Sequence, residues 1–418
     1  MRRRTKPITF LIYAMLLSIF IRWWLYWEAL FSIPIGPYLV YFSEFVVTGG
    51  VLILLINGYV EIRNFTKFAI LLFYFLLLHG FLVTLFREEY RILDIIISAW
   101  YVTLPFLFIS VLPFAQKKIL KYLLALTLGW FSIQVIFGSL GLLIGISQTL
   151  VYDEYANVYR VNNTLGGPTA GAQNAFLLLL TFLELDTGHR KLKIILVVLV
   201  LVALILNFSR SVWIEIILLT GYLLYKSLKG KTSSFRPREV LYAIIIGGLI
   251  IFLQRTSIFV AIQARLSKVS TTESDIRRLN KISYAIGVIK TYNYQWFGTG
   301  FGTSYLRSWI PESTKPILKG FSSTFTLSNY YLLSPHNTYL VFLGEIGFVG
   351  LLLVFGLFIK YIYPKIKFSN FALFGVFVVL ATTMMTETTL FLPNSLYAFA
   401  MLLWAGASST IKRTETQI

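Results

Sequence analysis

The stretch SPHNTYLVFLGEIGFVG, residues 334–350, places a polar Pro-His-Asn directly before a long apolar run. That run extends to about residue 359, which gives a helix the roughly 20 residues it needs to cross about 30 Å of hydrocarbon. The stretch therefore predicts a helical membrane protein. It also raises the question of why His336 stands at the mouth of a span.

The composition agrees with a membrane protein. The 418 residues are 57% hydrophobic and 13% charged, with a mean hydropathy of +0.75, which is more apolar than a soluble domain. Apolar runs separated by short charged loops predict an all-α fold, a polytopic membrane helical bundle of about 12 transmembrane helices. The predicted spans are 8–27, 37–60, 67–86, 92–114, 119–147, 171–186, 194–208, 212–226, 240–254, 337–359, 369–390 and 395–411.

The net charge of +19 follows the topology of the spans. If MRRRTK at the N-terminus is cytoplasmic, the loops on that side hold most of the Lys and Arg, as the positive-inside rule requires. Both termini are then cytoplasmic, and the charge does not indicate nucleic-acid binding. The chain has no cysteine, which excludes disulfides, thiolate catalysis and cysteine-ligated metals.

One outer loop, residues 255–335, is far longer than an ordinary connection, and loops of that length are usually functional. It divides the chain into N-terminal transmembrane helices (1–146), central transmembrane helices with an outer loop (147–254), the large periplasmic or extracellular loop (255–335) and C-terminal transmembrane helices (336–418).

Two features stand out inside this loop. Residues 276–290, IRRLNKISYAIGVIK, predict an amphipathic helix at the membrane surface. Its apolar positions are Ile276, Leu279, Ile282, Ile286 and Ile289. The following WFGTGFGTSYL holds Gly298, Gly300 and Gly302, which permit tight turns or close approach to a ligand.

Arginines gather on the predicted outer face. They are Arg160, Arg210, Arg255, Arg265, Arg277, Arg278 and Arg307. A guanidinium group suits phosphate or pyrophosphate, and at a membrane surface this favours a lipid-linked substrate. His336 is the only histidine expected in the outer loops, and an imidazole can take a proton from a hydroxyl at neutral pH. One base and several arginines could thus activate an acceptor hydroxyl and hold a pyrophosphate leaving group.

Several of these residues also have ordinary structural explanations. Asn337 is expected to cap the helix or to orient His336. At least one of Arg277 and Arg278 is expected to reach towards lipid headgroups. Trp23, Trp24 and Trp27, near the end of the first span, fit an interfacial aromatic belt.

The motifs resemble those of the O-antigen ligase and polymerase family. His336-Asn337, followed by Gly347 and Gly350, is similar to the motif of this family, and SRSVWI at 209–214 resembles its Ser-Arg signature. The segments RLNKISYAIGVIKTYNYQWFGTGFG and YRVNNTLGGPTAGAQNA resemble two further family segments.

The resemblance implies a GT-C-like enzyme that moves a glycan from undecaprenyl diphosphate to a hydroxyl acceptor at the outer face of the bacterial cytoplasmic membrane, without metal, nucleotide or other cofactor. Carried over by position, His336 would be the base, and Arg210 and Arg278 the diphosphate ligands, with Arg277 as the competitor of Arg278. Arg160, in a Gly-rich loop, is a further candidate for contacting the donor. Asn337, Ser209, Gly347 and Gly350 would support the site.

Ligase activity, with lipid A core as the acceptor, is the favoured expectation. A polymerase that extends a second carrier-linked glycan, a transporter or flippase of lipid-linked sugars, and a scaffold among envelope-assembly proteins are the alternatives. Direct attack of the acceptor on the diphosphate-linked anomeric carbon, with no protein nucleophile, is expected to invert that carbon.

Overall fold

The computed structural model is built mainly of helices. The residues that it describes are 6–25, 32–35, 38–58, 64–85, 92–139, 150–153, 158–161, 163–165, 168–185, 190–207, 209–228, 282–283, 285–290, 293–301, 337–366, 370–384 and 393–415. The helices are α1 (Lys6–Trp24), α2 (Phe42–Ile56), α3 (Asn64–Leu85), α4 (Ile92–Ile109), η1 (Leu112–Phe114), α5 (Lys117–Ser139), α6 (Pro168–Glu184), α7 (Arg190–Leu206), α8 (Arg210–Leu228), α14 (Thr338–Tyr361), α15 (Tyr363–Ile366), α16 (Asn370–Val378), the π-helical turn η4 (Val379–Thr383) and α18 (Pro393–Glu415).

The predicted spans agree closely with these helices. Every predicted span except 240–254, which lies outside the described residues, overlaps a helix, although the span 37–60 also takes in strand residues 38–41. Within the described part of the chain, five segments are long and apolar enough to cross a membrane: Pro7–Trp24, Asn64–Val83, Ile95–Phe114, Lys117–Ser139 and Thr338–Tyr361. Parts of α2, α7, α16 with η4, and α18 form shorter apolar helices.

Two antiparallel hairpins were not expected from the sequence. Strands β1 (Ser32–Ile35) and β2 (Tyr38–Tyr41) connect α1 to α2, and β3 (Leu150–Asp153) and β4 (Val158–Val161) lie between α5 and α6. The expectation of an all-α fold therefore holds for the bundle but not for these connections.

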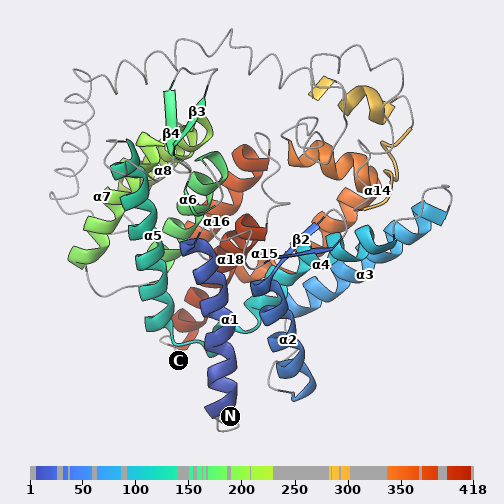
Figure 1. Ribbon diagram of the computed structural model, residues 1–418, viewed down its shortest axis with the longest axis horizontal. Helices are drawn as coiled ribbons and strands as arrows, with labels where there is room; N and C mark the ends of the chain where they lie inside the picture. Colours follow the sequence, from blue (N-terminus) through green and yellow to red (C-terminus); the bar gives the residue numbers. More distant parts are fainter. Residues whose placement is uncertain are drawn as a thin grey trace.

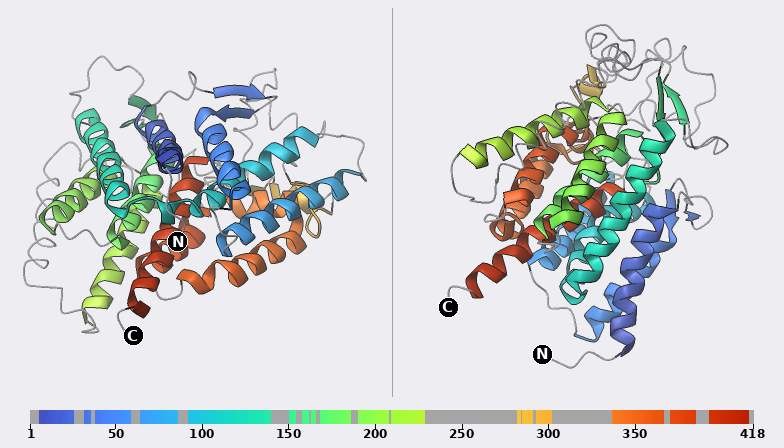
Figure 2. Two further views of the ribbon diagram at one scale, coloured as in Figure 1. Left: turned by 90° about the horizontal axis from the view of Figure 1, so that it is seen from below. Right: turned by 90° about the vertical axis from the view of Figure 1, so that its left-hand side faces the viewer.

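The helices form one bundle with its two ends distinguishable (Figure 1). Helix α1 begins and α18 ends at the same end of the bundle, whereas the hairpin β3–β4 lies at the opposite end, as Figure 1 and the right-hand view of Figure 2 show. This is the arrangement expected when both chain ends lie on one side of a membrane.

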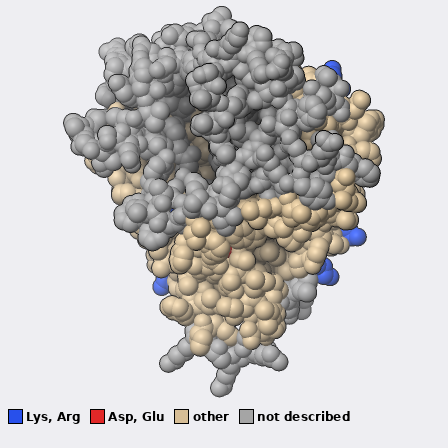
Figure 3. Space-filling view, turned by 45° about the vertical axis from the view of Figure 1, so that its right-hand side comes forward, with Lys and Arg blue, Asp and Glu red and all other residues tan. Residues whose placement is uncertain are grey.

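The outer surface of the bundle is apolar. Large side chains such as Phe10, Ile56 and Ile217 are more than two-thirds exposed, at 76%, 82% and 69%. In Figure 3 most of the described surface carries neither acidic nor basic side chains. Such a surface would be unstable in water but is suited to lipid, because hydrocarbon does not penalise exposed apolar side chains.

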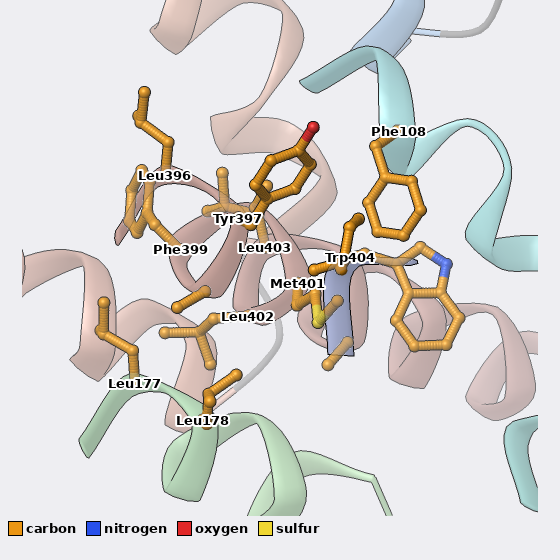
Figure 4. Close-up of a cluster of buried hydrophobic side chains, with 14 of the residues drawn as sticks. Phe108, Leu177, Leu178, Leu396, Tyr397, Phe399, Met401, Leu402, Leu403 and Trp404 are labelled. Carbon is orange, nitrogen blue, oxygen red and sulfur yellow. The ribbon is translucent and has the colours of Figure 1, made fainter. Parts of the chain in front are cut away.

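Helix α18 lies at the centre of the packing. Its residues Tyr397 to Ala405 are buried, and it packs against α6 and α4. Figure 4 shows Leu402 of α18 beside Leu177 and Leu178 of α6, with Phe108 of α4 near Tyr397. The Phe108 and Tyr397 rings meet edge to face, with centroids 5.6 Å apart.

A buried ion pair joins the first two helices. Arg22 of α1 lies 2.7 Å from Glu44 of α2, and the Arg22 guanidinium stacks 3.7 Å from the ring centroid of Tyr41. The backbone N–H of Tyr41 also donates to Glu44 (2.7 Å). Charges in such a place are stable only when they are paired and hydrogen-bonded, so this cluster fixes how α1 meets α2.

The expectation of an aromatic belt at the end of the first span is wrong for Trp23; Trp24 is half-buried, and Trp27 lies outside the described residues. Trp23 is fully buried, with Phe20 edge to face against its ring. The Trp24 indole N–H donates to the Thr127 hydroxyl of α5 (2.8 Å). Both side chains therefore serve helix packing.

Candidate functional site

Helix α14, which follows His336 in the sequence, is bent. Its backbone leaves the helical conformation at Gly347, where φ is 67° and ψ is −178°. Figure 1 shows the bend, which we call the elbow, in the orange ribbon of α14. A left-handed φ favours glycine, because a side chain there would crowd the following carbonyl.

The elbow breaks two helical hydrogen bonds, and a distant segment replaces them. In a continuous helix, Gly344 and Glu345 would accept from the N–H groups of Phe348 and Val349. Here residues 293–301, which we call the docking turn, supply the partners. Its four bonds are Thr299 N to Gly344 O (2.9 Å), Gly300 N to Glu345 O (2.9 Å), Phe348 N to Gln295 O (2.7 Å) and Val349 N to Trp296 O (3.1 Å). Backbone groups freed inside an apolar environment are thereby satisfied.

Two glycines make this contact sterically feasible. A Cβ added to Gly298 would lie 2.3 Å from the Glu345 carbonyl group, and one added to Gly347 would lie 2.3 Å from the Trp296 carbonyl oxygen. Of the two uses expected for the glycine-rich turn, the tight turn is confirmed at Gly298, where φ is 67°, and the close approach that it permits here is to the backbone of α14. A Cβ added to Gly350 would lie 2.6 Å from the Ile346 Cβ, and Gly302 lies outside the described residues.

A histidine that the sequence did not single out for this site contacts the docking turn. His79 of α3 donates from Nε2 to the Phe297 carbonyl (2.9 Å), since a carbonyl can only accept. Helix α3 packs along α14, so the docking turn is held from two sides. In the sequence, His79 stands out as a lone polar side chain within an apolar run. Its partner could not be predicted, because Phe297 is more than two hundred residues away in the sequence.

The predicted loop helix is partly described, at residues 282–283 and 285–290. Ala285, Val288 and Ile289 form a buried cluster against Leu340 and Leu343 of α14. Ile289 of the expected apolar stripe takes part in this contact, whereas Ile286 is 37% exposed. The loop helix thus packs on the first turns of α14, the part that directly follows His336.

Asn337 caps α14. Its side-chain oxygen accepts from the backbone N–H of Leu340 (3.0 Å), while its own backbone is extended. Of the two roles expected for Asn337, the cap is therefore confirmed.

The Ser-Arg signature lies at the start of α8. Arg210 is the first residue of that helix, and Ser209 before it is buried, with its hydroxyl 3.1 Å from that of Ser211. Gln173 of α6 donates to the Ser211 hydroxyl (3.3 Å). A buried polar layer therefore supports the turn that carries Arg210, where an unpaired polar group would be costly.

Other predicted residues are placed only in part or not at all. Arg160 is in β4, opposite Val151, and its side chain lies outside the described part. His336, Arg277 and Arg278 also lie outside the described residues. Among the described residues, no group of three or more His, Asp or Glu side chains is placed to hold a metal ion.

The comparison with protein families agrees with the motifs. Residues 195–355 match the family model described as O-antigen ligase. This segment is similar to an O-antigen ligase domain. The domain runs from α7 to the second half of α14, so it includes the Arg210 turn, the docking turn and the elbow. No curated protein matches the chain.

The O-antigen ligase domain and the apolar helices together indicate a bacterial membrane protein with glycosyltransferase-like activity on lipid-linked glycans. Of the residues predicted for the site, only Arg160 precedes the matched segment.

Proposed function

We propose that this protein is an O-antigen ligase, which transfers a glycan from undecaprenyl diphosphate to lipid A core at the outer face of the cytoplasmic membrane. The proposal includes about twelve spans in a GT-C-like arrangement, both termini in the cytoplasm, and the four-part division at residues 146, 254 and 335. The choice of lipid A core as the acceptor is the most specific part of the proposal, because a polymerase would use the same carrier and the same chemistry.

One observation carries the proposal. Ala285, Val288 and Ile289 of the loop helix pack on Leu340 and Leu343, close to the beginning of α14. Arg278 precedes the first buried residue of that contact by seven positions, and His336 precedes Leu340 by four. This arrangement supports a site in which a base and a diphosphate ligand approach each other from two sides.

In the proposed reaction, His336 takes the proton of the acceptor hydroxyl, whose oxygen then bonds to the anomeric carbon of the glycan. The bond between that carbon and the diphosphate oxygen breaks, and its electron pair leaves with the diphosphate. Arg210 and Arg278 stabilise the growing negative charge, with Arg277 as the alternative to Arg278 and Arg160 as a further contact. Direct displacement inverts the anomeric centre, and no metal takes part.

The test uses the purified protein in nanodiscs with an undecaprenyl diphosphate-linked oligosaccharide, in EDTA and without nucleotide. Lipid A core and a second portion of carrier-linked glycan are offered in separate reactions, and products are identified by mass. A product on lipid A core supports the ligase proposal. A ladder of lengthened carrier-linked glycan would replace it with polymerase activity, and transfer to neither would refute both.

A further inference from the structure

We propose that the π-helical turn η4 is the shared support of the two helices that begin at the reaction centre, and that Tyr339, Thr382 and Glu215 are positioning residues. This inference rests on the proposed function, in which Arg210 precedes α8 and His336 precedes α14. It assigns a role to polar side chains that have no part in the chemistry itself.

The first contact joins η4 to α14. The Tyr339 hydroxyl donates to the Leu380 carbonyl (2.6 Å). Tyr339 is the second residue of α14 and stands three positions after His336, so this bond restrains the turn from which His336 emerges. Asn337 restrains the same turn from within, through its cap on Leu340.

The second contact joins η4 to α8. The Thr382 hydroxyl lies 3.2 Å from Glu215 Oε1 and 2.6 Å from the Val378 carbonyl, two acceptors that share its one hydrogen. Glu215 is only 1% exposed and stands five positions after Arg210. A buried carboxyl group needs such a partner, so its position in α8 is tied to that of Thr382.

Both contacts fall within one five-residue turn, Val379–Thr383. A π-helical turn departs from the ordinary helical hydrogen-bond ladder, a costly irregularity that occurs frequently at functional sites. Here Leu380 faces α14 and Thr382 faces α8, so the turn links the two helices that carry the predicted base and the predicted diphosphate ligand.

The experiment compares full-length variants in the transfer assay, with matched controls at Thr382 and Glu215. Tyr339→Phe removes only the hydroxyl, and we expect kcat to fall about three- to tenfold with little change in donor KM. Thr382→Val keeps the shape but loses the hydroxyl, and Glu215→Leu loses the carboxyl. For these two we expect donor KM to rise by about the same factor, because they act through Arg210.

The controls separate positioning from general stability. Thr382→Ser and Glu215→Gln keep a polar partner and should restore donor KM to within about twofold of the wild type. The unfolding temperature of every variant is measured in the same nanodiscs. The inference would be overturned if Tyr339→Phe and Thr382→Val were folded and had wild-type kcat and KM. It would also be overturned if the loss of activity in each variant matched the loss of folded protein.

A second measurement does not depend on activity. Hydrogen exchange should become faster at residues 338–342 in Tyr339→Phe and at residues 211–216 in Thr382→Val, while Thr382→Ser stays at the wild-type rate. Unchanged hydrogen exchange in both variants would refute the proposed link between η4 and the two helices, even if the wild type transferred no glycan. Faster exchange in the variants, together with no glycan transfer by the wild type, would refute only the proposed function.

Discussion

At the scale of single residues, buried polar groups decide where the helices meet. Arg22 and Glu44 form a desolvated pair, and Asn337 and His79 each satisfy one backbone group. Gly298 and Gly347 allow the docking turn to contact the elbow because they have no side chain. The sequence marks such residues as unusual in apolar runs, but it does not name their partners.

The Arg22 and Glu44 pair gives a direct test of this view. Glu44→Leu should destabilise the protein by about 3–5 kcal/mol, because it leaves a buried guanidinium without its counter-charge. Arg22→Met combined with Glu44→Leu should recover most of that loss, since an apolar pair of similar volume needs no charge compensation. Unfolding in detergent micelles measures both. A double variant as unstable as Glu44→Leu would show that the unpaired charge is not the cause.

The elbow gives a second test at one residue. Gly347→Ala should cost at least about 2 kcal/mol, because alanine resists the left-handed conformation and its Cβ would meet the Trp296 carbonyl. Gly356→Ala in the same helix is the control: a Cβ there has no heavy atom within 4 Å, so the change should be neutral or slightly stabilising. Equal stability of the two variants would contradict the steric account.

At the scale of elements, the spans were predictable and their irregularities were not. A span follows from the length of an apolar run, which is why predicted and observed helices coincide. The elbow depends on hydrogen bonds between residues 293–301 and 344–349, about 50 positions apart. The glycines predicted tight turns or close approach to a ligand, but not the contact with the backbone of α14. The hairpins β1–β2 and β3–β4 were missed because four-residue strands leave little pattern.

The docking of the loop helix can be tested with two isoleucines. Ile289→Ala should destabilise the contact with α14 by about 2–4 kcal/mol, since it opens a cavity in a buried cluster. Ile286→Ala, at a position 37% exposed, should cost less than about 1 kcal/mol. Limited proteolysis between residues 282 and 301 reports the effect: cleavage should be faster only in Ile289→Ala. Equal cleavage of both variants would mean that the cluster does not hold the loop.

At the scale of the whole molecule, the apolar surface and the common end of α1 and α18 fit a bundle that crosses a membrane with both chain ends on one side. The number of spans and the side on which the site lies were read from charge and hydropathy. Both depend on orientation in a bilayer, which helix packing alone does not determine.

The absence of cysteine makes the orientation directly measurable. Lys290→Cys, exposed at the end of the loop helix, should react with a membrane-impermeant maleimide in intact cells. Lys118→Cys, exposed at the start of α5, should react only after the membrane is opened. The wild type serves as an unlabelled control, and the reverse pattern would place the site on the cytoplasmic side.

The most direct test of the central claim is the rate of glycan transfer by His336→Ala, measured beside the wild type and His189→Ala in nanodiscs with the carrier-linked donor and lipid A core. A lost general base lowers turnover by about 10²- to 10⁴-fold. We therefore expect that loss in His336→Ala alone, with insertion and unfolding temperature unchanged. A correctly folded His336→Ala protein with near-normal turnover would contradict the assignment of His336 as the base.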